Sequence, residues 1–321
     1  MSGQSNRYFA LAATTVVATL ILIAIGSVVR TTGSGLGCPD WPLCHGQWHP
    51  PLEKTAIIEY THRTAAAIVG VLVVATAIVT LRTRWGDVPS RWLAITSLPL
   101  LGFQAWLGKE TVERELPPEV VTFHLATAMV LLAILTVMAG FAYLGSDRAP
   151  DVSERRGSMV RAASAGAVIM FIVLLSGAYV VGANATSACT SWPGCAEAAI
   201  PFADGGREQS IHWLHRFVVV GGLLAVTGVT WAVLRNRSAG RLMRRSAWLL
   251  VVLYGTQILV GASNMWTDFS EASRVAHLAL GAAIWSLMVL IAIGGRYRAG
   301  VRSGAATAEP SRSRPEAAAR V

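Results

Sequence analysis

The sequence EYTHRTAAAIVGVLVVATAIVTL occupies residues 59–81 and joins a long apolar run to a group of polar residues at its start. Glu59, His62 and Arg63 lie within its first five positions, and the next charged residue is Arg82. A helix needs about 20 mainly apolar residues to cross the hydrocarbon core of a bilayer. The segment therefore predicts a transmembrane helix with ionisable side chains near one end.

Seven other segments have the same character. They comprise residues 8–29, 91–110, 120–144, 161–183, 210–234, 247–265 and 275–295. The chain is 53% hydrophobic and only 14% charged, which is outside the usual range of soluble domains. Because backbone polar groups must be satisfied inside a bilayer, we predict an all-α integral membrane protein with eight transmembrane helices.

The basic residues indicate how these helices are oriented. The formal net charge is +9, and arginines gather in the connections at 82–91, 148–161 and 235–245 and again after residue 295. Such connections face the cytoplasm, so both termini are expected there and the cysteine-containing loops on the outer face. The charge thus favours membrane lipid over nucleic acid as a partner, and we expect a multi-pass protein of the cell membrane.

The chain also repeats itself. Residues 59–81 recur 153 positions later as HWLHRFVVVGGLLAVTGVTWAVL at 212–234, and CPDWPLC at 38–44 recurs 151 positions later as CTSWPGC at 189–195. Each copy holds four predicted spans, so the second copy enters the membrane in the same direction as the first. We therefore expect two four-helix bundles related by a pseudo-twofold axis along the membrane normal.

The repeat defines the expected domains. Residues 1–144 form the N-terminal half and residues 161–298 the C-terminal half. Residues 145–160 are polar and contain arginine, and we predict a cytoplasmic linker there. Residues 299–321 are rich in Ala, Ser, Arg and Pro, a composition that predicts a disordered tail.

Two pairs of histidines follow the repeat. His62 opens the second predicted span and His124 lies about one turn into the fourth, while His215 and His277 match them in the second half. Both spans of a pair run inward, so the two imidazoles lie at similar depth and could hold an iron between them. A single histidine near a helix end is as readily an interfacial hydrogen-bonding group, but four in register indicate two haem sites. Zinc fits less well, because it needs a third or fourth ligand and no cysteine or additional carboxylate occurs in both halves at this depth.

One position breaks the repeat beside these histidines. Glu59 lies three residues before His62, whereas its counterpart is His212, three residues before His215. Residues three apart share a helix face, so a carboxylate is expected at the first haem site only. Acid–base chemistry therefore belongs to the first half. The alternative is that Glu59 only pairs with Arg63 or caps the helix.

The histidines are followed by arginines, and the loops carry cysteines. Arg63 and Arg216 could bind a haem propionate or face lipid headgroups. The outer face is an oxidising compartment, so local disulfides are favoured among the three possible pairings. These would join Cys38 to Cys44 and Cys189 to Cys195.

Together these segments are similar to the haem A synthases, membrane enzymes that convert haem O to haem A for cytochrome oxidase. The resemblance covers about residues 8–295. It rests on TTGSGLGCPDWPLC at 31–44, on IEYTHR at 58–63, on the segments around His124 and His277, and on the second cysteine loop.

The resemblance implies a role for each site residue. Haem B would be a cofactor liganded by His215 and His277, and haem O would be the substrate, held or flanked by His62 and His124. Glu59 matches the essential glutamate of that family, as a proton acceptor or as a stabiliser of positive charge. The implied reaction oxidises the methyl group at ring position 8 to a formyl group, with water as the oxygen source.

The resemblance also implies an electron-transfer partner, and haem O synthase is a candidate partner. The first cysteine pair matches family cysteines to which a redox or a structural part is ascribed. The second pair favours a structural disulfide in each half, while a redox role for Cys38 and Cys44 stays open.

Two other functions compete with this one. A bis-histidine dihaem b-type electron carrier explains the four histidines but not Glu59. A transporter would explain the repeat, but its spans should be broken near the centre, and Pro99 in the third span has no equivalent in the seventh.

Overall fold

The long secondary-structure elements of the protein are all α-helices. The computed structural model describes residues 3–145, 149–150, 154–195, 206–237 and 239–298. Within these ranges the chain forms eight long helices: α1 (Gly3–Thr31), α2 (Lys54–Thr83), α3 (Val88–Glu113), α4 (Pro118–Leu144), α5 (Glu154–Gly182), α6 (Arg207–Arg235), α7 (Arg241–Trp266) and α8 (Glu271–Arg296).

Seven of these helices are long and apolar enough to cross a membrane, namely all except α3. Helix α3 is as long as α7 and α8 but carries Lys109, Glu110 and Glu113 among its last five residues. It packs between α2 and α4. The chain is therefore a multi-pass membrane protein, and the prediction of eight apolar spans is confirmed for seven.

The helix starts follow from local chemistry. Pro89 and Pro118 occupy the first turns of α3 and α4, where a missing backbone N–H costs no helical hydrogen bond. Ser270 caps α8 by accepting a hydrogen bond from the backbone N–H of Ser273 at 3.3 Å.

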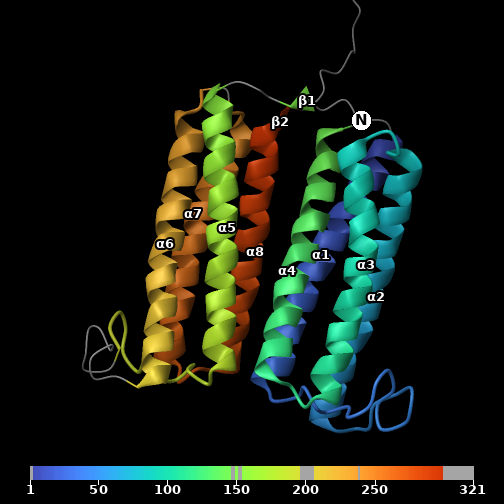
Figure 1. Cartoon of the computed structure of the whole chain (residues 1–321), viewed down its shortest axis with the longest axis vertical. Coiled ribbons are helices and arrows are strands. Elements are labelled where there is room, and N and C mark those ends of the chain that lie inside the picture. The colour runs from blue at the N-terminus through green and yellow to red at the C-terminus, as the bar shows by residue number, and fades with distance from the viewer. Residues whose placement is uncertain (1–2, 146–148, 151–153, 196–205, 238, 299–321) are drawn as a thin grey trace, which may run out of the picture.

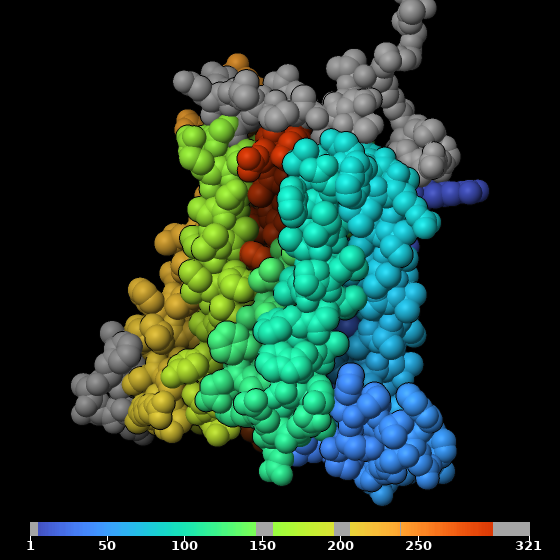
Figure 2. Space-filling model, turned by 45° about the vertical axis from the view of Figure 1, so that its right-hand side comes forward, coloured from blue at the N-terminus to red at the C-terminus, as the bar shows by residue number. Residues whose placement is uncertain are grey.

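The helices pack in sequence order. Helices α1 to α4 contact one another around a ring, α5 to α8 do the same, and the two sets meet where α4 contacts α5 and where α8 contacts α1 and α4 (Figure 1). Figure 2 shows α8, in red, recessed between α5 and the first four helices. The two cysteine loops lie at one end of the molecule, and the N-terminus lies at the other.

Helices α4 and α8 carry the contact between the two sets deep in the membrane-spanning region. The indole Nε1 of Trp285 donates to the carbonyl oxygen of Met129 at 3.1 Å, and the hydroxyls of Thr136 and Ser286 lie 2.9 Å apart. Lipid offers these polar groups no partner, and the bonds between α4 and α8 satisfy them inside the protein.

The structure differs from the sequence-based expectation in two places. Helix α5 begins at Glu154, so the last part of the predicted linker, residues 145–160, is helical. Charged residues are good helix formers, and a helix can continue beyond its apolar span. Two short strands, β1 (Ala149–Pro150) and β2 (Tyr297–Arg298), pair antiparallel at the ends of the two halves. The predicted tail, residues 299–321, lies outside the described residues.

A substitution of Trp285 tests the contact between α4 and α8, which joins the two sets of helices. Replacing it with alanine should lower the free energy of unfolding by about 3 kcal/mol, because the change removes a buried ring and a buried hydrogen bond. The measurement is a denaturant titration of the purified protein in mixed micelles. Trp248 on α7 is 57% exposed and serves as the control. Equal destabilisation by Trp248→Ala would contradict the assignment of Trp285 to this contact.

Candidate functional site

The four predicted histidines occupy matching positions within their helices. His62 and His215 each lie eight residues after the first residue of α2 and α6, and His124 and His277 each lie six residues after the first residue of α4 and α8. His62 therefore does not open its helix, as the hydropathy pattern suggested, but lies about two turns inside it. The helix starts earlier because Lys54 to Ile58 continue it beyond the apolar run.

Glycines on neighbouring helices make room for the imidazoles. A Cβ atom added to Gly26 on α1 would lie 3.1 Å from Cε1 of His62, and one added to Gly177 on α5 would lie 3.2 Å from Cε1 of His215. Larger side chains at these positions would push the rings aside. The sequence carries a signal for this pair, since Gly26 and Gly177 are 151 residues apart and so occupy equivalent positions of the repeat.

The other two histidines are seated in the same way. A Cβ atom at Gly108 on α3 would lie 3.5 Å from Cε1 of His124, and one at Gly261 on α7 would lie 3.0 Å from Cε1 of His277. Each imidazole thus sits against a glycine of the helix beside it. The repeat therefore includes the glycines beside the histidines as well as the histidines themselves.

Hydrogen bonds to the histidines are only partly repeated. The Nε2 of Gln104 donates to the carbonyl oxygen of His124 at 3.0 Å, and the Nε2 of Gln257 donates to that of His277 at 2.9 Å. In the first half Thr127 donates to Oε1 of Gln104. The equivalent residue in the second half is Leu280, and Oε1 of Gln257 is buried with no hydrogen-bond partner among the described residues.

The ring nitrogens differ between sites as well. Nδ1 of His215 lies 2.8 Å from the hydroxyl of Ser176. Nδ1 of His62 and Nδ1 of His277 are buried and have no hydrogen-bond partner in the described part of the chain. A buried, unbonded nitrogen is costly, so these rings are suited to a ligand that the protein itself does not supply.

All four histidines line one large cavity of about 1590 Å³, which runs through both sets of helices. Ordinary small-molecule pockets measure about 300–1,000 Å³. Glu59, Arg63 and Arg216 also line it. Both predicted sites therefore open into one continuous space with mainly apolar walls.

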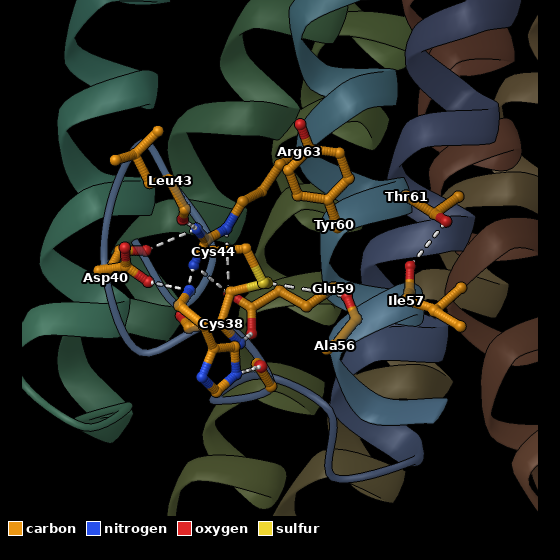
Figure 3. Close-up of a disulfide and its surroundings, with 12 residues drawn as sticks. Cys38, Asp40, Leu43, Cys44, Ala56, Ile57, Glu59, Tyr60, Thr61 and Arg63 are labelled. Carbon is orange, nitrogen blue, oxygen red and sulfur yellow. Dashed lines mark hydrogen bonds and ion pairs between the residues drawn. A yellow bond between two sulfur atoms is a disulfide. The ribbon is translucent and has the colours of Figure 1, made fainter. Parts of the chain in front are cut away.

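Glu59 is almost fully buried, with 3% of its surface exposed. Its carboxylate accepts hydrogen bonds from the backbone N–H of Cys38 at 3.0 Å and from Nε and Nη2 of Arg63 at 3.1 and 2.5 Å (Figure 3). The pairing with Arg63, which the sequence left open as an alternative, is therefore present. The same carboxylate also lines the cavity, so the ion pair does not remove it from the site.

Arg63 holds the first cysteine loop against α2. Its guanidinium donates to the carbonyl oxygens of Asp40, Leu43 and Cys38 at 2.7, 2.8 and 2.7 Å (Figure 3). The loop is braced further by Asp40, whose carboxylate accepts from the backbone N–H of Gly46 at 2.8 Å. That hydrogen bond lowers the pKa of the Asp40 carboxyl below its usual value.

Arg216 acts in the same way in the second half. Its Nη1 donates to the carbonyl oxygens of Ser191 at 2.7 Å and of Gly194. His212 fills the position of Glu59, is buried, and has its Nδ1 3.0 Å from the carbonyl oxygen of Ala185. Both arginines predicted to contact propionates therefore bond to loop backbone, Arg63 through Nη1 and Nη2 and Arg216 through Nη1, while Nη2 of Arg216 lies near His212 and Met265.

The cysteines lie as the local pairing predicts. Cys38 is next to Cys44 and Cys189 is next to Cys195, each pair with a Cα–Cα distance of 4.6 Å and sulfur atoms within bonding distance. All four side chains are buried. Each pair closes the loop that the arginine of the same half holds.

Comparison with known proteins supports a single family. The sequence model of the family described as cytochrome oxidase assembly protein matches residues 9–289. A protein named "Heme A synthase" from Symbiobacterium thermophilum is 28% identical over 291 residues, which cover 89% of this chain and 94% of the relative.

Two further relatives carry the same name. The one from Geobacillus thermodenitrificans is 26% identical over 94% of this chain and 96% of its own length, and the one from Shouchella clausii is 30% identical over 77% of this chain and 83% of its own. The family match runs from α1 into α8 and includes both histidine pairs. The chain therefore belongs to the cytochrome oxidase assembly protein family.

Proposed function

We propose that this chain is a haem A synthase, which oxidises the C8 methyl group of haem O to a formyl group and so produces haem A. The observation that carries this proposal is the difference between two otherwise repeated sites. Both have a pair of seated histidines, but only the first has a buried carboxylate, Glu59, where the second has His212. The name shared by the relatives agrees with this function.

The donor set suits haem iron. A haem supplies four equatorial nitrogens and needs at most two ligands from the protein, one on each face. In the part of the chain that the structure describes, no three His, Cys, Asp or Glu side chains cluster to hold a metal ion. The Nδ1 atoms of His62 and His277 fit the same interpretation, because neither has a hydrogen-bond partner among the described residues.

We assign the second pair to the cofactor. His215 and His277 would hold haem B, which supplies a one-electron redox centre when bound. The Ser176 hydroxyl lies beside Nδ1 of His215 and orients the imidazole ring, so that Nε2 would be the nitrogen that binds iron. The position equivalent to Glu59 holds His212 and not a carboxylate, and we assign electron transfer to this site.

We assign the first pair to the substrate. His62 and His124 would ligate or flank haem O within the shared cavity. Glu59 lies one helical turn from His62, and the N–H of Cys38 and the guanidinium of Arg63 hold its carboxylate in place. An ionised carboxylate held in this way can accept a proton or stabilise positive charge that develops near the reacting carbon.

The overall reaction defines what else the enzyme needs. Conversion of a methyl group and one water to a formyl group releases four electrons and four protons. An electron-transfer partner must accept the electrons, and Glu59 is the first acceptor available for the protons. Haem O synthase, the source of the substrate, is a candidate partner in the membrane.

We further propose the topology predicted from sequence: eight spans including α3, two pseudo-twofold-related bundles (residues 1–144 and 161–298), cytoplasmic termini and cysteine loops on the outer face of the cell membrane. The shared end of the two cysteine loops and the ring contacts within each set of helices support this arrangement. In that compartment Cys38–Cys44 and Cys189–Cys195 would be structural disulfides.

The main test replaces the carboxylate. Glu59→Gln should lower haem A formation by about 100-fold or more, since it removes a general base, while haem B stays bound. Pigments extracted from cells that express the variant with a haem O source give both quantities. Glu110→Gln is the matched control, because Glu110 also forms an i,i+4 ion pair but does not line the cavity.

Haem A output from Glu59→Gln equal to that of the control would contradict the role of Glu59. A wild-type preparation that contains haem B and never forms haem A would favour the dihaem electron carrier instead.

The assignment of the two pairs is tested separately. His277→Ala should lose most of the haem B that purifies with the protein, because one axial ligand is removed. His62→Ala should keep that haem B but fail to form haem A. The haem content per chain, from the pyridine haemochrome spectrum, measures the difference. Equal loss of haem B from both variants would contradict separate cofactor and substrate sites.

A further inference from the structure

Two arginines where α1 meets α8 form no ion pair with an acidic side chain among the residues that the structure describes. Arg30 lies in the last turn of α1 and Arg274 in the first turn of α8, and both line the cavity. Nη2 of Arg274 donates to the carbonyl oxygen of Thr31 at 3.2 Å, which brings the two helix ends together. Nε of Arg274 is buried and has no hydrogen-bond partner within the described ranges.

Each arginine lies one turn from a histidine site. Arg274 is three residues before His277 and so shares its face of α8. Arg30 is four residues after Gly26, the glycine that seats His62, and so shares that face of α1. Both are displaced from their histidine sites toward the end of the molecule that carries the cysteine loops.

The repeat shows that the fold does not require these charges. The position equivalent to Arg30 is Val181 on α5, and the position equivalent to Arg274 is Val121 on α4. Both valines also line the cavity. The cavity thus has two cations at the seam of α1 and α8 and two apolar side chains at the equivalent positions of α5 and α4.

The placement of Arg274 has an electrostatic cost. A cation in the first turn of a helix opposes the positive end of the helix dipole. The first turn of α8 also contains Glu271, but the two side chains form no ion pair within 4.0 Å among the described residues. A buried, partly unbonded guanidinium in such a position is suited to an anion that enters the cavity.

We propose that Arg274 and Arg30 bind the carboxylate side chains of the two tetrapyrroles, Arg274 in the His215–His277 site and Arg30 in the His62–His124 site. This inference rests on the proposed function. It differs from the expectation that Arg63 and Arg216 do so, since both of those guanidinium groups already bond to loop carbonyl oxygens. The planar guanidinium fork matches a carboxylate in geometry and charge.

The contact would fix the rotation of the ring. A porphyrin held only by axial histidines can turn about the axis through the iron, so the histidines alone do not select one ring methyl. In haem O the C8 methyl neighbours a propionate-bearing ring carbon. A carboxylate bound at Arg30 would therefore determine which ring substituent approaches Glu59.

The experiment compares haem B with its dimethyl ester, which lacks the carboxylates. Full-length protein from a haem-deficient host is placed in nanodiscs and titrated by Soret absorbance. The Arg274→Gln variant is studied with His62 and His124 replaced by alanine, and Arg30→Gln with His215 and His277 replaced, so that each titration reports one site. Arg114→Gln is the control, because Arg114 is an outer-end cation that does not line the cavity.

With both arginines intact, each site should bind haem B at least about tenfold more tightly than the diester, since a hydrogen bond to a charged group supplies that much. In Arg274→Gln and Arg30→Gln this ratio should fall to about one, whereas Arg114→Gln should keep it. The lysine variants retain the charge and should keep part of the ratio, which separates lost recognition from lost folding.

An unchanged ratio in the glutamine variants would overturn this inference while leaving the haem sites in place. Failure of the wild-type protein to bind either compound would overturn the proposed function as well.

Discussion

The constraint on which this structure depends is the absence of water around polar groups in the membrane. An imidazole in hydrocarbon needs a partner and a space of its own. Each of the four histidines has such a space because a glycine stands beside it on the next helix. Ser176 lies beside a ring nitrogen of His215 and Gln104 beside those of His124, whereas Gln257 bonds only the backbone carbonyl oxygen of His277. Nδ1 of His62 and Nδ1 of His277 have no hydrogen-bond partner among the described residues, and such nitrogens are suited to a ligand.

A repeated scaffold makes departures from the repeat informative. The positions of the histidines in their helices, the glycines beside them and the bonds from arginine to the cysteine loops recur in both halves. A residue that differs between equivalent positions is therefore not needed for folding. Glu59 against His212, and Arg30 and Arg274 against valines, are differences of this kind, and all of them line the same cavity. These charged or titratable side chains therefore distinguish the two sites, together with the uncharged differences at Ser176 and Thr127.

Much of the architecture was predictable from the sequence. The apolar runs predicted the helices, and the offset of the repeat predicted the equivalence of the histidines, because both signals are local or periodic. The contact of Arg63 and Arg216 with propionates stays a prediction, and the sequence did not indicate their bonds to the loops. Their position after a histidine suggested contact with a ligand, but the loops that fold back on them present carbonyl oxygens at hydrogen-bond distance. A pattern of residue types does not show which side chains a loop will contact when it folds back on its helix.

The sequence by itself determined the membrane-spanning class, the repeat and the identity of the paired residues, because run length, spacing and composition are properties of the chain. Only the tertiary structure decided which donors remain available. Arg63 is bonded to residues 20 to 25 positions away, and Arg274 reaches Thr31 across 243 positions. Such contacts depend on how separate helices pack, so the position of Arg274 beside the end of α1 was visible only in three dimensions.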